Sequence, residues 1–286
     1  MPGKLFVIAT PIGNLGDISQ RMVEALAEAD VVAAEDTRVT RKLLSHLGLS
    51  KPLISCHRHN ELSRVNELIA RMADEGQTVA LTSDAGTPAI SDPGHALVAA
   101  AWASNVRVVP ICGPSAITAA LSVSGYDCGE FAFYGFLPRE AGKLREKLKA
   151  MRSAGVGVAV VFESPRRVTG LMAALAGLYA ECRVTVCCDL TKYYELIIRG
   201  TAREALEALE SNPNAEKGEY CVVIDFSALP PPKDDGARIS LEALIFNEMV
   251  SGAALSEAAA RVIGQGHPRN QVYKAQLNMK KFITET

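Results

Sequence analysis

The residues best suited to chemistry in this chain form a glycine- and proline-rich loop at residues 83–94. The loop follows a short apolar segment typical of a buried strand and precedes a helical pattern over residues 95–104. Asp84 and Asp92 supply carboxylates that can accept backbone hydrogen bonds or meet a cation. Such a loop at a strand end indicates a ligand site, although an ordinary turn between a strand and a helix has a similar composition.

Two other strand-like segments also lead into Gly/Pro loops. Residues 5–9 run into a loop at 10–17, and residues 106–111 run into a loop at 113–116. Strands and helices alternate five times between Leu5 and Ser124, which predicts a parallel α/β sheet with helices on both faces. Because the carboxyl ends of parallel strands share one edge, we expect the three loops to form one site there.

The rest of the chain predicts a second α/β domain and a helical tail. Residues 126–138 are expected to cross into the second domain, whose predicted strands cover 158–162, 183–190, 195–198 and 220–224. Two of these strands follow each other without an intervening helix, so the second sheet should be mixed. A proline-rich linker precedes a helical region, giving three predicted domains: 1–125, 126–228 and 239–286.

Composition excludes several classes of protein. The net charge of −2 over 286 residues gives no overall attraction to nucleic acid, so any RNA contact must be local. No run of eighteen apolar residues occurs, and we expect a cytoplasmic protein without a membrane partner. The seven cysteines form no C-x-x-C pair and are expected to be small buried hydrophobes, and we expect no metal at Cys56-His57-Arg58-His59. Walker A and dinucleotide-binding glycine motifs are absent.

Seven short phrases carry a family resemblance. They are Thr-Pro-Ile-Gly-Asn-Leu-Gly-Asp at 10–17, Ala-Glu-Asp-Thr-Arg at 34–38, Ser-Asp-Ala-Gly-Thr-Pro at 83–88, Gly-Phe-Leu-Pro at 135–138, Phe-Glu-Ser-Pro at 162–165 with Arg167, Leu-Thr-Lys at 190–192 and Lys-Gly-Glu at 217–219. In this order they resemble the ribosomal RNA small-subunit methyltransferases of the tetrapyrrole (corrin/porphyrin) methylase superfamily. The likeness covers residues 5–225 and extends to the helical tail.

The resemblance implies an S-adenosylmethionine-dependent enzyme that methylates the 2′-oxygen of a cytidine ribose in small-subunit (16S) ribosomal RNA. It also implies two α/β domains with the cofactor between them, a homodimer, and no metal. The positions that match cofactor contacts of the superfamily are Pro11, Ile12, Gly13, Ser83, Asp84, Ala85, Gly86, Ile90, Ser115, Ala116 and Leu190. Backbone groups and small side chains suit a ligand that carries a sulfonium cation and an amino-acid tail.

The expected substrate and catalytic residues are less specific. Substrate contacts are expected at Glu35, Asp36, Arg38 and Arg166, although Glu35 and Asp36 could equally cap the helix that begins near Arg38. Lys192 and Glu163 are the expected catalytic residues. Lys192 can act as a base only if its pKa is lowered, and a nearby carboxylate such as Glu163 or Asp189 would favour a positioning role instead. Cys188 and Asp189 stand where the resemblance leads us to expect Arg-Glu.

Two alternatives remain open on the sequence alone. One is a small-molecule methyltransferase of the tetrapyrrole type, and the other is a non-catalytic RNA-binding protein. The tail favours an RNA substrate because no acidic residue occurs between Arg261 and Ile283, where its basic residues Arg269, Lys274, Lys280 and Lys281 lie. Val272, Ala275, Met279 and Phe282 recur at helical spacing, which predicts that this face packs while the cations point outward.

Overall fold

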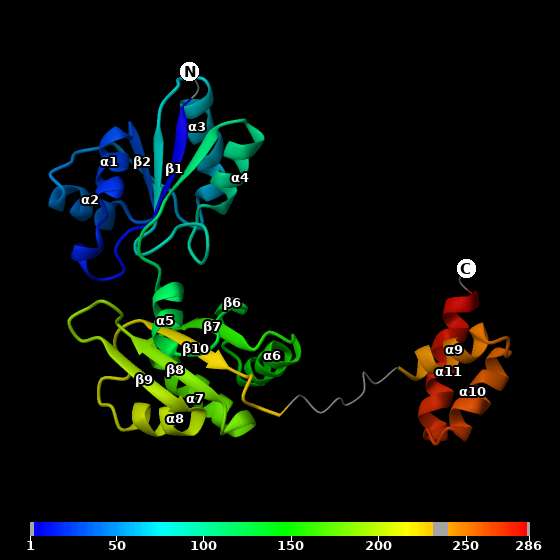
Figure 1. Cartoon of the computed structure of the whole chain (residues 1–286). Coiled ribbons are helices and arrows are strands. Elements are labelled where there is room, and N and C mark those ends of the chain that lie inside the picture. Colours follow the sequence, from blue (N-terminus) through cyan, green and yellow to red (C-terminus); the bar gives the residue numbers. More distant parts are fainter. Residues whose placement is uncertain (1–2, 231–239, 285–286) are drawn as a thin grey trace. The chain divides into compact units, whose positions relative to one another are not determined.

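The computed structural model describes residues 3–230 and 240–284, the last four by backbone alone. Residues 1–229 form one compact unit and residues 230–286 a second (Figure 1). The first unit contains two five-stranded sheets. The division of this unit at residue 125 stays a prediction.

The first sheet is parallel throughout, as predicted. Its strands lie in the order β3-β2-β4-β1-β5. They are β1 (Lys4–Ile8), β2 (Val31–Ala34), β3 (Leu53–Ser55), β4 (Val79–Thr82) and β5 (Arg107–Ile111). Residues of β2 and β4 are buried on both faces, which explains why these strands read as unbroken apolar segments.

Helices cover both faces of this sheet, so this prediction is confirmed. The helices are η1 (Leu15–Asp17), α1 (Gln20–Glu28), α2 (Thr37–His46), α3 (Glu61–Ala73) and α4 (His95–Ala103). One buried cluster joins Leu5 and Leu81 to Leu68 and Leu97, and a second joins Ile8 to Met22 and Leu44. Figure 1 accordingly shows α1 and α2 on one side of the strands and α3 and α4 on the other.

The second sheet is mixed, also as predicted. Its order is β6-β7-β10-β8-β9, with only β6 and β7 parallel. The elements are α5 (Ala116–Ser124), β6 (Phe131–Phe136), α6 (Ala141–Ser153), β7 (Val158–Glu163), α7 (Pro165–Tyr179), β8 (Arg183–Cys188), β9 (Leu196–Thr201), α8 (Ala202–Glu210) and β10 (Tyr220–Asp225). Edge strand β6 lies within residues 126–138, where the sequence predicted a crossing and no strand. Gly135 interrupts the apolar pattern of that strand.

One helix that follows the first sheet packs on the second sheet. Helix α5 contacts β8 and β10, and its Ala120 and Leu121 share a buried cluster with Val160 and Cys187. Ile12, from the loop after β1, belongs to the same cluster. The opposite face of the sheet packs against α6, α7 and α8 through a larger core that includes Leu148, Leu171 and Ala205.

The start of α3 and two of the cysteines depart from the usual pattern. Asn60 occupies the N-cap position of α3 but does not cap it, because its side chain accepts a hydrogen bond from His57 N–H at 2.7 Å and donates to the Ser55 carbonyl at 3.1 Å. Five cysteines are buried as expected, whereas Cys112 is exposed and Cys128 is half-buried.

The second unit is a three-helix module. Its helices are α9 (Leu241–Val250), α10 (Leu255–Gly264) and α11 (Arg269–Thr284), so the helical region predicted after the linker is confirmed for the described residues. Val272 and Ala275 are buried against Ile245 and Val262, and Met279 packs on this core, so the predicted apolar face is confirmed for these residues. The Phe282 and Lys281 side chains lie outside the described part. Arg261 is ion-paired with Glu248 and Glu257, which reduces the positive charge predicted for the tail.

Within the described ranges, no helix is both long and apolar enough to cross a membrane.

Candidate active site

The loops after β1 and β4 are joined at the carboxyl edge of the first sheet. Thr10 and Gly86 exchange two backbone hydrogen bonds, of 2.9 and 3.0 Å, and the Thr10 hydroxyl donates to the Ser83 carbonyl at 3.1 Å. Ser83 is buried in this junction. Gly86 has a φ of +80° and Gly94 a φ of +130°, values that L side chains rarely adopt. The convergence of these two loops is therefore as expected, and glycine is needed for it.

The loop after β1 also lies against the loop after β8. A β-carbon on Gly13 would lie 2.4 Å from Lys192 Cγ and 3.2 Å from the Leu190 carbonyl oxygen. Asp189 and Thr191 have positive φ angles of 51° and 67°, which are uncommon for residues other than glycine. Strained backbone of this kind persists where surrounding contacts enforce it and often marks a functional site.

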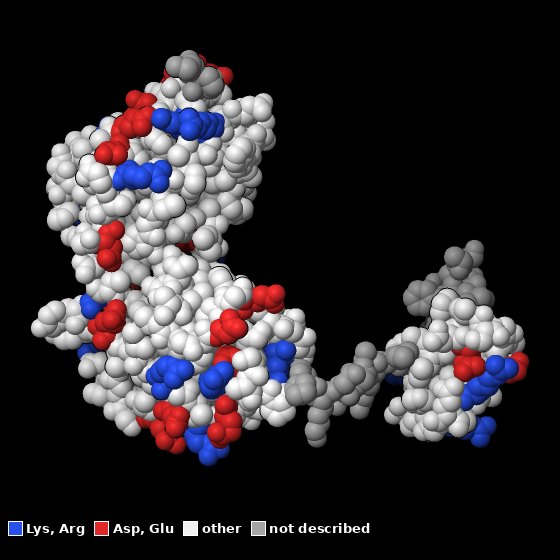
Figure 2. Space-filling view, viewed as in Figure 1, with Lys and Arg blue, Asp and Glu red and all other residues white. Residues whose placement is uncertain are grey.

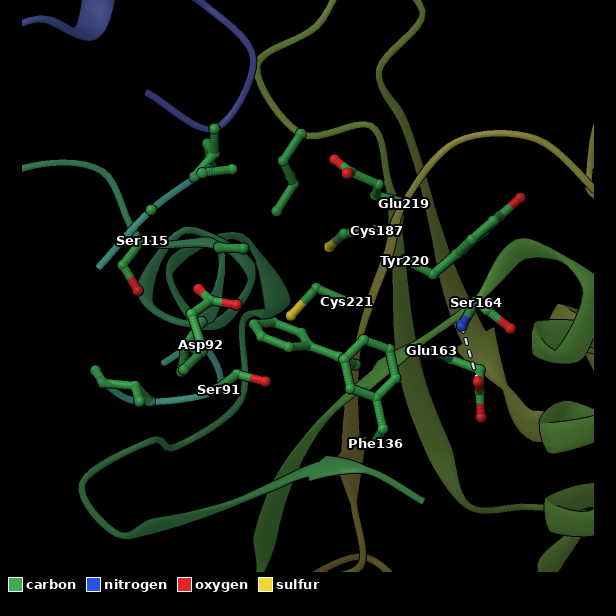
Figure 3. Close-up of a pocket in the computed structure, with 18 of the residues that line it drawn as sticks. Ser91, Asp92, Ser115, Phe136, Glu163, Ser164, Cys187, Glu219, Tyr220 and Cys221 are labelled. Atoms are coloured by element: carbon green, nitrogen blue, oxygen red, sulfur yellow. Dashed lines mark hydrogen bonds between the residues drawn. The ribbon is translucent and has the colours of Figure 1, made fainter. Parts of the chain in front are cut away.

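A cavity of about 380 Å³ lies beside these loops (Figure 3). Its first wall comes from loops at the carboxyl edge of the first sheet and from the start of α5: Ile12, Ala85, Gly86, Thr87, Ile90, Ser91, Asp92, Ser115, Ala116 and Ile117. Its second wall comes from the strands and strand ends of the second sheet: Phe136, Phe162, Glu163, Ser164, Pro165, Cys187, Leu190, Gly218, Glu219, Tyr220 and Cys221.

Eight of the expected site residues line this cavity. They are Ile12, Ala85, Gly86, Ile90, Ser115, Ala116, Leu190 and Glu163. The other expected residues do not line it: Pro11, Gly13, Ser83 and Asp84 of the cofactor set, Glu35, Asp36, Arg38 and Arg166 of the substrate set, and Lys192. Ser83 and Gly13 act instead on the shape of the loops, through the contacts described above. The functional role of each residue stays a prediction.

Asp92 lines the first wall, and the carboxylates of Glu35 and Asp84 interact with it from outside the cavity. The Asp36 N–H donates to Asp84 Oδ1 at 3.0 Å, and the Asp84 N–H donates to Glu35 Oε2 at 3.3 Å. Partial burial, together with the negative charge of neighbouring carboxylates, raises the pKa of Glu35, Asp84 and Asp92 above their ordinary values. Arg58 partly offsets this at Glu35 and Asp92. The wall therefore has a negative bias that suits a cationic ligand.

Asp36 serves as a helix cap. It is the N-cap of α2, where its Oδ1 accepts the Arg38 N–H at 2.8 Å, and its carboxylate pairs with the Arg38 guanidinium at 2.7 Å. These hydrogen bonds from Arg38 lower the pKa of Asp36 to about 2. Of the two alternatives left open by the sequence, the capping role is the one supported for Asp36.

Lys192 is held by two carboxylates. Its Nζ lies 2.7 Å from Asp189 Oδ1 and 2.8 Å from Glu219 Oε2. Partial burial alone would lower the pKa of Lys192, but the hydrogen bonds that it donates to Asp189 and Glu219 together outweigh burial, so the pKa is raised. This geometry favours a positioning role over a base. Asp189 stands where the resemblance leads us to expect a longer glutamate, and its carboxylate still reaches the lysine.

Glu163 is not a partner of Lys192, contrary to one expectation. Its buried carboxylate accepts the Ser164 N–H at 2.8 Å through Oε1, the contact dashed in Figure 3. Its Oε2 lies 3.0 Å from Arg167 Nη2, but without hydrogen-bond geometry, and finds no hydrogen bond among the described residues. Burial raises the pKa of Glu163, although Ser164, Arg167 and Arg139 oppose the shift.

Most of the residues that the sequence did not predict belong to the second wall. Phe136 and Glu219 lie inside two of the resembling phrases, so the phrases contained a signal that residue types alone did not reveal. Phe162 likewise opens the resembling phrase at 162–165, whereas Cys187 and Cys221 look like ordinary strand residues in the sequence. Within the part that the structure describes, no cluster of three or more His, Cys, Asp or Glu could hold a metal ion.

Comparisons with known proteins agree with this architecture. The family model described as Tetrapyrrole (Corrin/Porphyrin) Methylases matches residues 4–206. Ribosomal RNA small subunit methyltransferase I from Synechocystis sp. is 39% identical over 280 residues, which cover 97% of this chain and 99% of that protein. The protein of that name from Mesorhizobium japonicum is 41% identical over 280 residues, covering 96% and 92%.

Solved structures share the fold at low sequence identity. The methyltransferase CobJ gives a TM-score of 0.57 at 18% identity, covering 79% of this chain and 95% of that one. Uroporphyrin-III C-methyl transferase from Thermus thermophilus, complexed with S-adenyl homocysteine, gives a TM-score of 0.53 at 15% identity, covering 78% and 97%. The chain therefore belongs to the ribosomal RNA small subunit methyltransferase I family, within the tetrapyrrole (corrin/porphyrin) methylases.

Proposed function

We propose that this methyltransferase transfers the methyl group of S-adenosylmethionine to the 2′-oxygen of a cytidine ribose in small-subunit ribosomal RNA. The observation that carries the proposal is the cavity between the two walls, lined by eight of the expected site residues. Close relatives over almost the whole chain bear the name of a ribosomal RNA methyltransferase. An RNA substrate would place the protein in the cytoplasm.

The first wall fits the expected cofactor. Ala85, Gly86, Ser115 and Ala116 leave room for a ligand against the backbone. The carboxylates of Asp92, Asp84 and Glu35 give this side a negative charge that would attract a sulfonium. When bound, the cofactor supplies an electrophilic methyl group.

The chain's own contribution to the reaction is mainly positioning. Displacement at a methyl carbon is accelerated when the attacking oxygen is held in line at close range. Leu190, Ile12 and Phe162 supply apolar surface that limits water in the cavity. Lys192, fixed by Asp189 and Glu219 as a cation, anchors the strained loop that carries Leu190.

Positive and negative side chains are mixed over the visible face of the protein (Figure 2), so this face offers no broad positive surface for RNA. RNA affinity must therefore come from a local group of positive charges. Helix α11 carries Arg269 and Lys274, both exposed, on a module with its own core. Removing residues 230–286 should therefore spare cofactor affinity and weaken RNA binding, with the slope of log affinity against log salt falling by about 0.7–0.9 for each lost phosphate contact. Equal RNA affinity in the shortened protein would assign the contact to the first unit.

The direct test is methyl transfer from labelled S-adenosylmethionine. Small ribosomal subunits, protein-free RNA and a tetrapyrrole precursor are offered separately, and the RNA is digested to nucleosides. We expect label in 2′-O-methylcytidine, and no label with Ala85→Phe, which fills the first wall. Labelled tetrapyrrole, or label on a base, would contradict the proposal. Sedimentation of the wild-type protein tests the proposed homodimer.

A further inference from the structure

A turn between β3 and α3 contacts the cavity loop from outside the cavity. The turn covers residues 57–61 and includes the histidine-rich sequence at which no metal is expected. Asn60 shapes it, because its side chain accepts the His57 N–H and donates to the Ser55 carbonyl instead of capping α3. These two hydrogen bonds give the turn a defined conformation at the start of α3.

Glu61 caps a helix other than its own. Helix α4 begins after Gly94, which has no side chain to cap it. Glu61, only 4% exposed, supplies the missing cap: its Oε1 accepts the Gly94 N–H at 3.0 Å and the Ala96 N–H at 2.8 Å. A carboxylate is favoured there because the first N–H groups of a helix lack partners within the helix and its dipole is positive at this end. Helix α3 therefore holds the point at which the cavity loop enters α4.

Arg58 holds the same loop at a second point. Its Nη2 donates to the Ser91 carbonyl at 3.2 Å. Ser91 and Asp92 both line the cavity, and Figure 3 shows them side by side on the first wall. The charge of Arg58 also acts on Asp92, because it partly offsets the rise in the pKa of that carboxyl. Two side chains of one turn therefore contact the cavity loop, before and after Asp92.

The backbone held by these contacts is strained. Ala89 has a φ of +66°, which is uncommon for a residue other than glycine, and Gly94 has a φ of +130°. The Ala89 N–H donates to the Pro93 carbonyl at 3.2 Å and closes the segment on itself. Strained backbone persists only where the surrounding structure enforces it. Arg58 and Glu61 provide contacts of this kind.

We propose that Arg58 and Glu61 are positioning residues for the cofactor. They hold residues 89–94 in the conformation that places Ile90 and Asp92 along the first wall, so S-adenosylmethionine binds without first having to order this loop. Neither Arg58 nor Glu61 lines the cavity, so both act through the loop. This inference rests on the proposed placement of the cofactor against the first wall.

The role of Glu61 is tested with Glu61→Ala and Glu61→Gln. Alanine leaves the Gly94 and Ala96 N–H groups without their acceptor, whereas glutamine keeps a side-chain oxygen that can accept both. We expect calorimetry to give Glu61→Ala a Kd for S-adenosylhomocysteine that is raised about tenfold or more. Glu61→Gln should keep the Kd within about threefold of the wild-type value.

The role of Arg58 is tested with Arg58→Met and Arg58→Lys. Arg58 is exposed, so both variants should fold as the wild type does. Loss of one hydrogen bond to the loop should raise the Kd for S-adenosylhomocysteine about 3- to 10-fold in Arg58→Met, and lysine, which keeps a charged donor, should recover part of the affinity. Arg64→Met is the control, because Arg64 pairs with Glu67 on α3 and its loss changes the charge equally. Its Kd should be that of the wild type.

Steady-state kinetics separate positioning from a loss of folded protein. In Arg58→Met and Glu61→Ala, KM for S-adenosylmethionine should rise by about the same factor as Kd, while kcat and KM for RNA stay within about threefold of the wild type. A merely structural role would instead lower kcat in proportion to the folded fraction and leave KM unchanged.

Three results would overturn the inference. These are a wild-type Kd in Arg58→Met and Glu61→Ala, an equal loss of affinity in Arg64→Met, or a loss in Glu61→Gln as large as that in Glu61→Ala. Failure of the proposed cofactor placement is distinguishable, because Ala85→Phe would then bind S-adenosylhomocysteine as the wild type does. Failure of the RNA substrate leaves the calorimetry unaffected.

Discussion

The two walls of the cavity are built in different ways. The first wall consists of loops whose course depends on Gly86, Gly94 and the exchange of backbone hydrogen bonds between Thr10 and Gly86. The second wall consists of side chains from strand ends, together with a strained loop fixed by Lys192. Backbone shape dominates the first wall and side-chain identity the second. We therefore expect substitutions on the first wall to affect mainly the small ligand, and substitutions on the second to affect mainly the RNA.

Among the substitutions that distinguish the two walls, the one at Lys192 should have the largest effect on turnover. Lys192→Met leaves Asp189 and Glu219 without their shared cation and releases the loop next to Leu190, so turnover should fall on the order of tenfold to a hundredfold. Because its pKa is raised, Lys192 stays protonated through the neutral range. Single-turnover rates between about pH 6 and 9 should therefore keep the shape of the wild-type profile.

Lys192→Arg serves as the control, because it keeps the positive charge and should recover part of the rate. If the wild-type profile had a rising limb that Lys192→Met lost, Lys192 would be the base, and the second wall would take part in the chemistry directly. Unchanged S-adenosylhomocysteine affinity in Lys192→Met would support the assignment of the small ligand to the first wall.

A smaller effect is expected at Gly218, which lines the second wall and lies against Asp189. Its φ is +86°, and a β-carbon there would lie 2.4 Å from Asp189 Oδ2. Gly218→Ala combines backbone strain with displacement of the carboxylate that binds Lys192, and should lower the free energy of unfolding by about 2 kcal/mol.

Gly155→Ala is the matched control for that variant. Gly155 has a φ of +81° and nothing within 4 Å of a β-carbon, so only the strain of about 1 kcal/mol remains. Urea denaturation measures both. If both variants lost the same free energy of unfolding, the contact of the new β-carbon with Asp189 would contribute nothing to the loss. The second wall would then be less rigid than its geometry indicates.

The smallest effect is expected at Asp92 on the first wall. Burial raises the pKa of Asp92, so the native state binds its proton more tightly than the unfolded state does. Asp92→Asn should therefore raise Tm by about 1–3 °C at pH 8. This gain should shrink as the pH falls through the raised pKa, because the wild-type carboxyl then becomes neutral too. A gain in Tm that grew on acidification would mean that the native state favours the ionised form of Asp92. That result would contradict the raised pKa described for this carboxyl.

The same difference between walls explains what the sequence could and could not predict. The loops at 10–17, 83–94 and 113–116 were recognised because glycine and proline punctuate a chain wherever its backbone must turn. The parallel sheet followed from the alternation of apolar strands and amphipathic helices. Both signals are local, so a single sequence contains them.

The second wall depends on the pairing of strands, which is not local. Cys187 pairs with Cys221 across β8 and β10, and both face the cavity, whereas Cys188 belongs to the core on the opposite face. Only the observed register decides which neighbour lines the site. Strand β6 was missed for a related reason, because Gly135 produces the bulge that exposes Phe136 and also disrupts the strand pattern.

The division of the cavity into a cofactor wall and an RNA wall is tested most directly by titrating S-adenosylhomocysteine into a matched pair of variants. Ala85→Phe adds a ring to the first wall, and Phe136→Leu removes one from the second, both at residues that line the same cavity. The account predicts that calorimetry detects no binding to Ala85→Phe and wild-type affinity in Phe136→Leu, with both proteins melting as the wild type does. Wild-type affinity in Ala85→Phe, or a comparable loss in both variants, would contradict it.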